Sequence, residues 1–161
     1  MSNIRIRSFT LEDRSPILEI LQRTRMFTPE EIEVARELID AWLYHPEQKD
    51  YILYTSEGEG KVTGYVCYGP TPATEGTFDL YWIAVDPLYQ RSGIGRQLLL
   101  FTEKRIIESN GRLIIIETSS QEKYAPTRTF YERNGSTLEA RIHDFYRVGD
   151  DRLIYVKRFP S

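Results

Sequence analysis

Val85-Asp86-Pro87-Leu88-Tyr89-Gln90-Arg91-Ser92-Gly93-Ile94-Gly95-Arg96 joins a predicted strand, residues 78–85, to a predicted helix, residues 93–108. The N-terminus of a helix exposes unpaired backbone N–H groups and a partial positive charge, and both favour an anion. Gly93 and Gly95 lack the side chains that would keep a phosphate away from these groups. We therefore expect a pyrophosphate to bind at this helix start.

This loop matches neither of the two commonest phosphate-binding patterns. A P-loop requires Gly-x-x-x-x-Gly-Lys followed by Ser or Thr, and a dinucleotide fingerprint requires Gly-x-Gly-x-x-Gly. Gly95 also lies on the helix face that is predicted to pack against the sheet, so close packing is a second reason for a glycine there. Both explanations of the glycine pair stay open on the loop alone.

The segments on either side of the loop alternate between strand and helix patterns. Helices are predicted to begin at Thr10 and Thr28 and to cover residues 93–108 and 126–134. Strand patterns cover residues 4–9, 51–55, 61–68, 78–85, 113–116, 137–142 and 153–159. The last two strands are expected to form a hairpin around Gly149-Asp150-Asp151. The order βααβββαβαββ predicts a mixed α/β fold, with a mostly antiparallel sheet and helices on both faces.

Composition restricts the class of protein. The 161 residues fit one domain, 1–161, and 40% hydrophobic residues suffice for a core. The net charge is −3 and no long block of residues carries one sign, so we expect no nucleic-acid partner. Cys67 is the only cysteine and only two histidines occur, so we expect no disulfide and no metal. With no signal-peptide pattern and no long apolar segment, we expect a cytoplasmic protein without a membrane partner.

Two motifs resemble a known family. Val85-Asp86-Pro87 followed by Gln90-Arg91-Ser92-Gly93-Ile94-Gly95 is similar to the acetyl-CoA loop of the GCN5-related N-acetyltransferases (GNAT), with its pattern Gln/Arg-x-x-Gly-x-Gly/Ala. Phe130-Tyr131-Glu132-Arg133-Asn134-Gly135 resembles the helix of the family that ends Phe/Leu-Tyr-x-x-x-Gly. The resemblance implies a GNAT-like fold in which the strands before these two motifs splay apart. It also implies acetyl transfer from acetyl-CoA, as cosubstrate, to a primary amine of a small molecule or peptide.

The resemblance also implies a set of coenzyme A contacts. The backbone of Ile83 and Val85 would bond the pantetheine arm, and the amides from Arg91 to Arg96 would hold the pyrophosphate. The expected contacts are Ile83, Val85, Gln90, Arg91, Ser92, Gly93, Ile94, Gly95, Arg96, Tyr124 and Tyr131.

Tyr124 departs from the family pattern, because an Asn often stands at this position, seven residues before the catalytic Tyr. Gln121-Glu122-Lys123 is an insertion relative to ribosomal-protein-type members. Tyr124 either supplies a hydroxyl to the coenzyme A arm or caps the cleft with its ring.

Acetyl transfer to an amine requires a base for the ammonium proton and an acid for the leaving thiolate. By resemblance, Tyr131 is the acid, and the alternative is a tyrosine that only packs its ring. Two carboxylates are candidates for the base. Asp79 is predicted, by strand alternation, to share a face with Tyr81, Ile83 and Val85. Glu117 follows the apolar strand 113–116, and either carboxylate is equally well explained as a solvated residue at a strand end.

The acceptor site of this fold is usually built from the loop between the first two helices and from the final hairpin. The residues expected to contact the acceptor are Phe27, Tyr81, Asp144 and Tyr146. Aromatic rings beside a carboxylate suit a cationic amine, but the same residues are equally typical of a homodimer interface.

Other functions remain open at this stage. Because no histidine is near Cys67 in the sequence, direct attack by the amine is expected rather than a covalent acetyl-cysteine. The first alternative is a non-catalytic acyl-CoA-binding module, which needs the loop but not Tyr131. The second is a nucleotide-binding domain of another kind, which would prefer ATP or NAD to coenzyme A.

Overall fold

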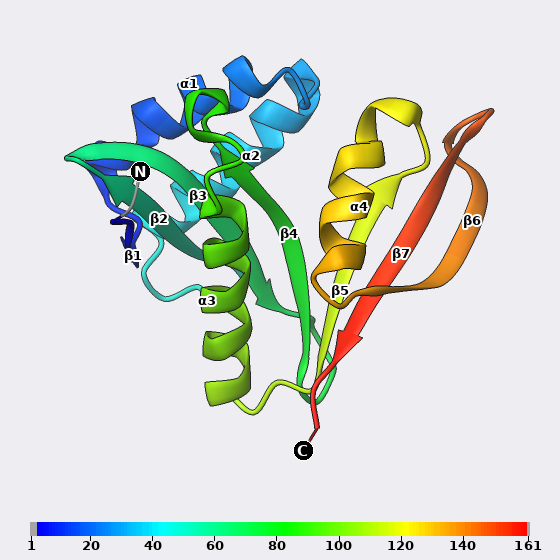
Figure 1. The fold of residues 1–161 in the computed structure, drawn as a ribbon. Coiled ribbons are helices and arrows are strands. Elements are labelled where there is room, and N and C mark those ends of the chain that lie inside the picture. The colour runs from blue at the N-terminus through cyan, green and yellow to red at the C-terminus, as the bar shows by residue number, and fades with distance from the viewer. Residues whose placement is uncertain (1–2, 161) are drawn as a thin grey trace.

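The computed structural model describes residues 3–160, so the first two residues and the last residue of the predicted domain lie outside it. The predicted order βααβββαβαββ is confirmed, and the strands form one sheet in the order β1-β2-β3-β4-β5-β7-β6 (Figure 1). The strands are β1 (Arg5–Ser8), β2 (Ile52–Gly58), β3 (Lys61–Pro70), β4 (Thr77–Val85), β5 (Leu113–Ser119), β6 (Thr137–Arg147) and β7 (Asp150–Arg158). The helices are α1 (Arg14–Thr24), α2 (Pro29–Tyr44), α3 (Ile94–Glu108) and α4 (Ala125–Arg133), with short 3₁₀ turns η1 (Leu11–Asp13), η2 (Pro87–Tyr89) and η3 (Glu122–Tyr124).

The sheet opens between β4 and β5. These two strands are parallel and pair only over Thr77–Asp79 and Leu113–Ile115, whereas the other neighbours in the sheet are antiparallel. Figure 1 shows β4 and β5 meeting at one end and separating toward the other, with α3 and α4 on either side of the opening. Beyond Asp79, the edge of β4 that faces β5 therefore has no strand partner.

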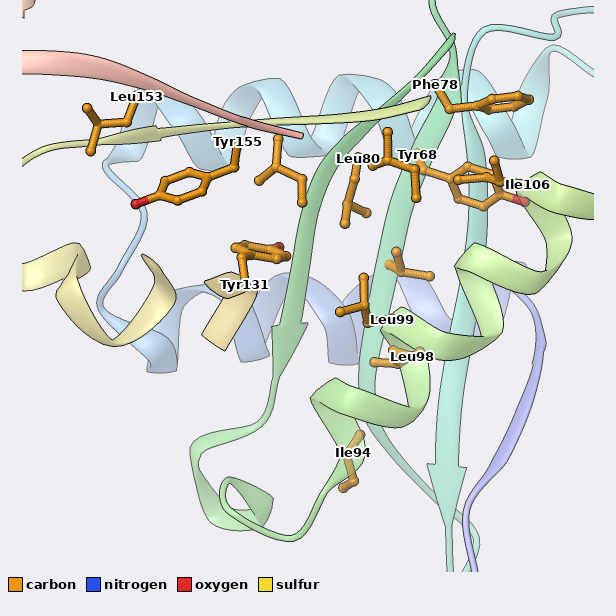
Figure 2. Packing of buried hydrophobic residues seen from close by; sticks show 13 residues of the cluster. Tyr68, Phe78, Leu80, Ile94, Leu98, Leu99, Ile106, Tyr131, Leu153 and Tyr155 are labelled. Atoms are coloured by element: carbon orange, nitrogen blue, oxygen red, sulfur yellow. The ribbon is translucent and has the colours of Figure 1, made fainter. Parts of the chain in front are cut away.

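Helices cover both faces of the sheet, because successive strand residues point to opposite faces. On one face, α1 and α2 pack on β2, β3 and β4 around Ile17, Leu21, Ile39, Tyr65 and Cys67. On the other face, α3 and α4 pack around Val66, Tyr68, Leu98, Leu99 and Tyr131. Figure 2 shows this second cluster, with Tyr131 beside Tyr155 at the end away from Ile106.

A β-bulge interrupts β4 at Tyr81. On the two sides of the bulge, Leu80 pairs with Tyr68 and Trp82 pairs with Cys67, so Tyr81 has no partner on β3. An extra residue of this kind shifts the alternation of side chains between the two faces of the sheet.

The bulge makes one sequence prediction wrong. Asp79 and Tyr81 do not share a face with Ile83 and Val85, which pack with the α3 and α4 cluster while Tyr81 packs with the α1 and α2 cluster. The bulge is set by the pairing of β4 with β3, and the alternation of apolar and polar residues along one strand carries no information on that pairing.

The C-terminal hairpin is longer than predicted. Its turn is Val148-Gly149, where Gly149 adopts φ 85°, and both Asp150 and Asp151 belong to β7 rather than to the turn. Residues 143–146 form an irregular bulge, since Ile142 pairs with Arg152 and Arg147 already pairs with Asp150. The sequence pattern predicts strands only over residues 137–142 and 153–159 because the acidic and aromatic residues between them lack an alternating pattern.

The predicted helix starts are confirmed with one refinement. At α2, Thr28 Oγ1 accepts from the Glu31 N–H at 3.1 Å and Glu31 Oε1 accepts from the Thr28 N–H at 2.9 Å, with Pro29 in the first turn. At α1, the 3₁₀ turn η1 comes first and the regular helix begins at Arg14. No helix within residues 3–160 combines the length and apolar character that crossing a membrane requires.

Candidate active site

Two cavities lie at the opening between β4 and β5. The larger, about 1070 Å³, is bounded by the start of α3, by α4 and by the end of β4. The smaller, about 480 Å³, is bounded by the α1–α2 loop, β4, β5, η3 and the C-terminal hairpin. Both are lined by Ile83, Val85, Gln90, Thr127 and Tyr131. The two cavities therefore meet in the opening of the sheet, where Tyr131 lies.

The loop between β4 and α3 exposes the start of α3 to the larger cavity. Asp86 caps the turn η2, because its Oδ1 accepts from the Leu88 N–H at 3.1 Å. Gly93 adopts φ 84° at the N-cap of α3, a conformation that favours glycine, and no side chain caps this helix. The backbone N–H groups of the first turn of α3 are thus left for a ligand.

The walls of the larger cavity carry positive charge and leave a gap at Gly95. Arg91, Arg96 and Arg133 line it, against Glu122 as the acidic lining residue. A Cβ added to Gly95 would lie 3.5 Å from Phe130 and 3.8 Å from Val85, so a side chain there would enter the gap between these two lining residues. The absence of a side chain at Gly95 therefore fits both explanations of this glycine, close packing of α3 and close approach of a ligand.

The predicted coenzyme A contacts fall mostly around this cavity. Its lining includes Ile83, Val85, Gln90, Arg91, Gly93, Ile94, Gly95, Arg96 and Tyr131. Ser92 is not in the lining, and its hydroxyl donates to the Tyr89 carbonyl within the loop. Tyr124 lines the smaller cavity instead, and its hydroxyl donates to the Met26 carbonyl at 3.2 Å. This bond connects η3 to the α1–α2 loop across the smaller cavity.

Tyr131 is the titratable residue common to both cavities. It stands on α4 with 5% of its surface exposed, and burial raises its pKa well above the usual value. The phenol therefore stays protonated across the physiological pH range and is available as a hydrogen-bond donor.

The two carboxylates proposed as base occupy different places. Glu117 lines the smaller cavity from β5 and is paired with Arg152 of β7, whose guanidinium lies 4.8 Å from the centre of the Phe145 ring. Asp79 lines neither cavity. It lies where β4 still pairs with β5, and its Oδ2 accepts from Thr71 Oγ1 at 2.8 Å.

Aromatic side chains form much of the smaller cavity. Phe27, Tyr81 and Tyr146, all predicted to contact the acceptor, belong to its lining. Phe27 meets Trp82 edge to face with ring centres 6.0 Å apart, and the Trp82 indole donates to the buried Tyr65 hydroxyl. These contacts hold the aromatic wall in place from behind.

Asp144 does not line the cavity. It adopts φ 56°, its N–H donates to Asp151 Oδ1 and its Oδ1 accepts from the Gly149 N–H, both at 2.8 Å. The carboxylate of Asp144 therefore closes the hairpin turn rather than facing the predicted acceptor.

Several residues line the cavities without a role predicted from the sequence. In the smaller cavity they are Glu31, Trp82, Lys123, Arg147 and Asp150, and in the larger cavity Phe130 and Arg133. Phe130 and Arg133 stand inside the quoted Tyr motif, which was the available signal for them. Asp150 had no such signal, because the sequence pattern assigned it to a turn.

Comparisons with known proteins agree with this geometry. The pattern of the acetyltransferase (GNAT) domain family matches residues 47–135. The structure is similar to that of a GNAT-family protein from Desulfovibrio desulfuricans, with 46% identity, coverage of 97% of this chain and 99% of that one, and a TM-score of 0.93. It shares the fold of the PaiA N-acetyltransferase from Thermoplasma acidophilum in complex with coenzyme A, with 19% identity, coverage of 98% and 99%, and a TM-score of 0.73.

A curated relative matches part of the chain. It is the S-(2-succino)cysteine N-acetyltransferase of Bacillus subtilis, 27% identical over 91 residues, which are 54% of this chain and 55% of the relative. The chain thus spans about half the length of that relative in the match. The family match over more than half of the sequence, together with the Desulfovibrio structure, gives the assignment: the chain belongs to the GNAT family of acetyltransferases.

Proposed function

We propose that the protein transfers an acetyl group from acetyl-CoA to a primary amine of a small molecule or peptide, by direct attack of the amine on the thioester. The observation that carries the proposal is the junction of two cavities at Tyr131, one with cationic walls and one with aromatic walls. A donor and an acceptor that enter from the two cavities would meet at this residue.

The larger cavity suits coenzyme A. Its cations Arg91, Arg96 and Arg133 and the free N–H groups of α3 are the partners that phosphates require. The edge of β4 around Ile83 and Val85 has no strand partner on β5, so its backbone groups can bond the amides of a pantetheine arm once the long hydrogen bond of 3.4 Å from Gln90 Nε2 to the Val85 carbonyl is released. When bound, acetyl-CoA supplies the activated thioester carbonyl.

The transfer step needs two proton movements. The amine nitrogen forms a bond to the acetyl carbon, the carbon–sulfur bond breaks, and the thiolate of coenzyme A leaves. Tyr131 donates a hydrogen bond to that sulfur, a role that its raised pKa supports. The ammonium form of the acceptor gives up one proton to Glu117, directly or through water, before the amine attacks. After the attack the positively charged nitrogen loses a second proton, which passes through water to the departing thiolate.

Glu117 is preferred to Asp79 as the base. Glu117 lines the smaller cavity, which we call the acceptor cavity because the amine is proposed to bind there. Asp79 instead accepts a hydrogen bond from Thr71 at the end where β4 and β5 are still paired. A base must reach the proton that it removes, so position decides between two carboxylates of similar chemistry.

Cys67 is not a suitable acetyl carrier. It is fully buried in the α1 and α2 cluster, and burial raises the pKa of its thiol. A thiol of this kind is a poor nucleophile, because the thiolate is the reactive form. Replacement of Cys67 by Ala should therefore leave turnover essentially intact.

The acceptor is proposed as a class only. The relative from Bacillus subtilis is named for acetylation of a cysteine derivative, which supports a small amine as acceptor. A thiol-release assay with acetyl-CoA across amino acids, polyamines, aminoglycosides and short peptides would identify it.

The decisive experiment compares two buried tyrosines of one cluster. Tyr131→Phe removes the hydroxyl at the junction of the cavities, and Tyr155→Phe removes one that lines neither cavity (Figure 2). We expect Tyr131→Phe to keep its affinity for coenzyme A and to lose about 10²-fold in turnover, and Tyr155→Phe to lose little. Coenzyme A binding without amine-dependent thiol release in the unmodified protein would instead identify an acyl-CoA-binding module.

The proposed function includes a location in the cell and an oligomeric state. We place it in the cytoplasm, where a reduced Cys67 persists, and in a homodimer. The edge strand β6 exposes the apolar residues Leu138, Ile142 and Phe145, which supports an interface on this side. Light scattering in solution tests this point, and a monomeric mass at working concentrations would contradict it.

A further inference from the structure

The 3₁₀ turn η3 places a lysine at the acceptor cavity. Gln121, Lys123 and Tyr124 all line this cavity. The Tyr124 hydroxyl is bonded to the Met26 carbonyl, and Lys123 Nζ lies 5.0 Å from the centre of the Tyr124 ring. The lysine is therefore supported at the wall by a residue that is itself fixed across the cavity.

The acidic groups of this cavity already have partners within the protein. Glu31 Oε1 accepts from the Thr28 N–H at 2.9 Å, as part of the α2 cap. Glu117 is paired with Arg152. The third acid, Asp150, accepts from the Ser119 hydroxyl and from Arg147 Nη1, the latter at 2.8 Å.

The two cations of the same lining differ. Arg147 is bonded to Asp150, whereas within residues 3–160 no carboxylate oxygen lies within 4.0 Å of Lys123 Nζ. Lys123 is exposed to solvent at the rim of this cavity, and its ammonium is thus the charged lining group that an anionic part of a ligand can pair with.

We infer that the acceptor carries a carboxylate near its reactive amine, as an α-amino acid or its derivative does, and that Lys123 binds this carboxylate. The inference rests on the proposed acetyl transfer at the same site. The amine lies toward Tyr131 and Glu117, the carboxylate toward Lys123, and an apolar side chain against the wall of Phe27 and Trp82. A polyamine would instead bring further positive charge to acids that are already paired and to a free lysine.

The test uses matched acceptors in the thiol-release assay. Each of the common amino acids is compared with its amide, which keeps the amine and the side chain and lacks the anionic charge. The variants are Lys123→Met, which removes the charge at the cavity, and Lys104→Met, which removes an exposed charge of α3 outside both cavities. For each variant, kcat and the KM values for acetyl-CoA and for the acceptor are measured.

We expect the preferred amino acid to have a KM about tenfold or more below that of its amide. Lys123→Met should raise KM for the amino acid to that of the amide, with little change in kcat or in KM for acetyl-CoA, and Lys104→Met should change neither. An equal KM for acid and amide, or an equal effect of Lys123→Met on both, overturns the inference while acetyl transfer stands. Absence of thiol release with every amine overturns the proposed function and this inference with it.

Discussion

Arg23 Nη2 donates a hydrogen bond of 2.7 Å to Oδ2 of Asp86, which joins α1 to the loop that begins α3. The Asp86 side chain is 5% exposed, and its other oxygen caps the turn η2. One carboxylate thus fixes both the shape of the loop and its position on the helix layer of the opposite face.

Arg23→Met should weaken coenzyme A binding, although Arg23 lines neither cavity. Loss of the guanidinium leaves the buried Asp86 carboxylate without its charged partner and loosens the loop. Because Arg23 is 46% exposed, we expect a modest effect, about 1 kcal/mol or roughly a fivefold higher dissociation constant by calorimetry. Arg36→Met, at the exposed pair with Glu33, is the control. Equal affinities in the two variants would contradict the role given to Asp86.

Gly95→Ala should separate stability from binding. The added Cβ makes ordinary contacts at 3.5 Å with Phe130 and 3.8 Å with Val85, and alanine favours a helix over glycine by up to about 1 kcal/mol. The melting temperature should therefore be equal or higher. The methyl group enters the larger cavity beside the backbone amides proposed to hold the pyrophosphate, so the affinity for coenzyme A should fall about tenfold. A more stable variant with unchanged affinity would place the pyrophosphate elsewhere.

The pH profile of turnover should reflect the raised pKa of Tyr131. Burial disfavours the phenolate, so the phenol keeps its proton beyond the ordinary tyrosine value of about 10. The rate should rise with pH as the acceptor amine loses its proton, and it should not fall again up to about pH 10. A falling limb below that pH that disappears in Tyr131→Phe would show that the phenol ionises more easily than its burial implies.

Asp13 should contribute stability that acid removes. Burial by itself raises the pKa of Asp13, but the hydrogen bonds from Arg7, the Thr10 N–H and Thr55 outweigh burial and lower it. A carboxyl whose pKa is lower in the folded state stabilises above its unfolded pKa, about 3.9, and this contribution is lost as the pH falls through the folded pKa.

Asp13→Asn should therefore lower the free energy of unfolding by about 3 kcal/mol at pH 7, and the difference from the unmodified protein should shrink below about pH 4. Asp40→Asn is the matched control, because its pair with Arg14 is partly exposed and should be worth about 1 kcal/mol or less. Urea unfolding at both pH values measures this, and a difference independent of pH would rule out the charged form of Asp13 as the cause.

The order of elements and the loop proposed to bind coenzyme A were accessible from the sequence because they depend on local physics. The capping residues of α2, the glycine at the start of α3 and the apolar run of β5 each act within a few residues of chain. The Tyr motif on α4 is equally local, and its resemblance to the family placed Tyr131 correctly on that helix.

The smaller cavity, which we propose as the acceptor site, depends on contacts between distant segments. The bulge at Tyr81 arises from pairing with β3, which turned Asp79 away from Ile83 and Val85. Glu117 of β5 forms an ion pair with Arg152 of β7. Neither relationship leaves a periodic pattern in the sequence, because each is set by strand register.

Periodicity and capping determined which segments become strands and helices, since those preferences are properties of neighbouring residues. Tertiary structure decided which side chains share a cavity. The Tyr124 hydroxyl donates a hydrogen bond to the Met26 carbonyl, 98 residues away in the chain. This bond holds the turn that carries Lys123 at the wall of the smaller cavity. Such a contact depends on the geometry of the folded sheet, in which the separation of β4 from β5 creates the space that these residues surround.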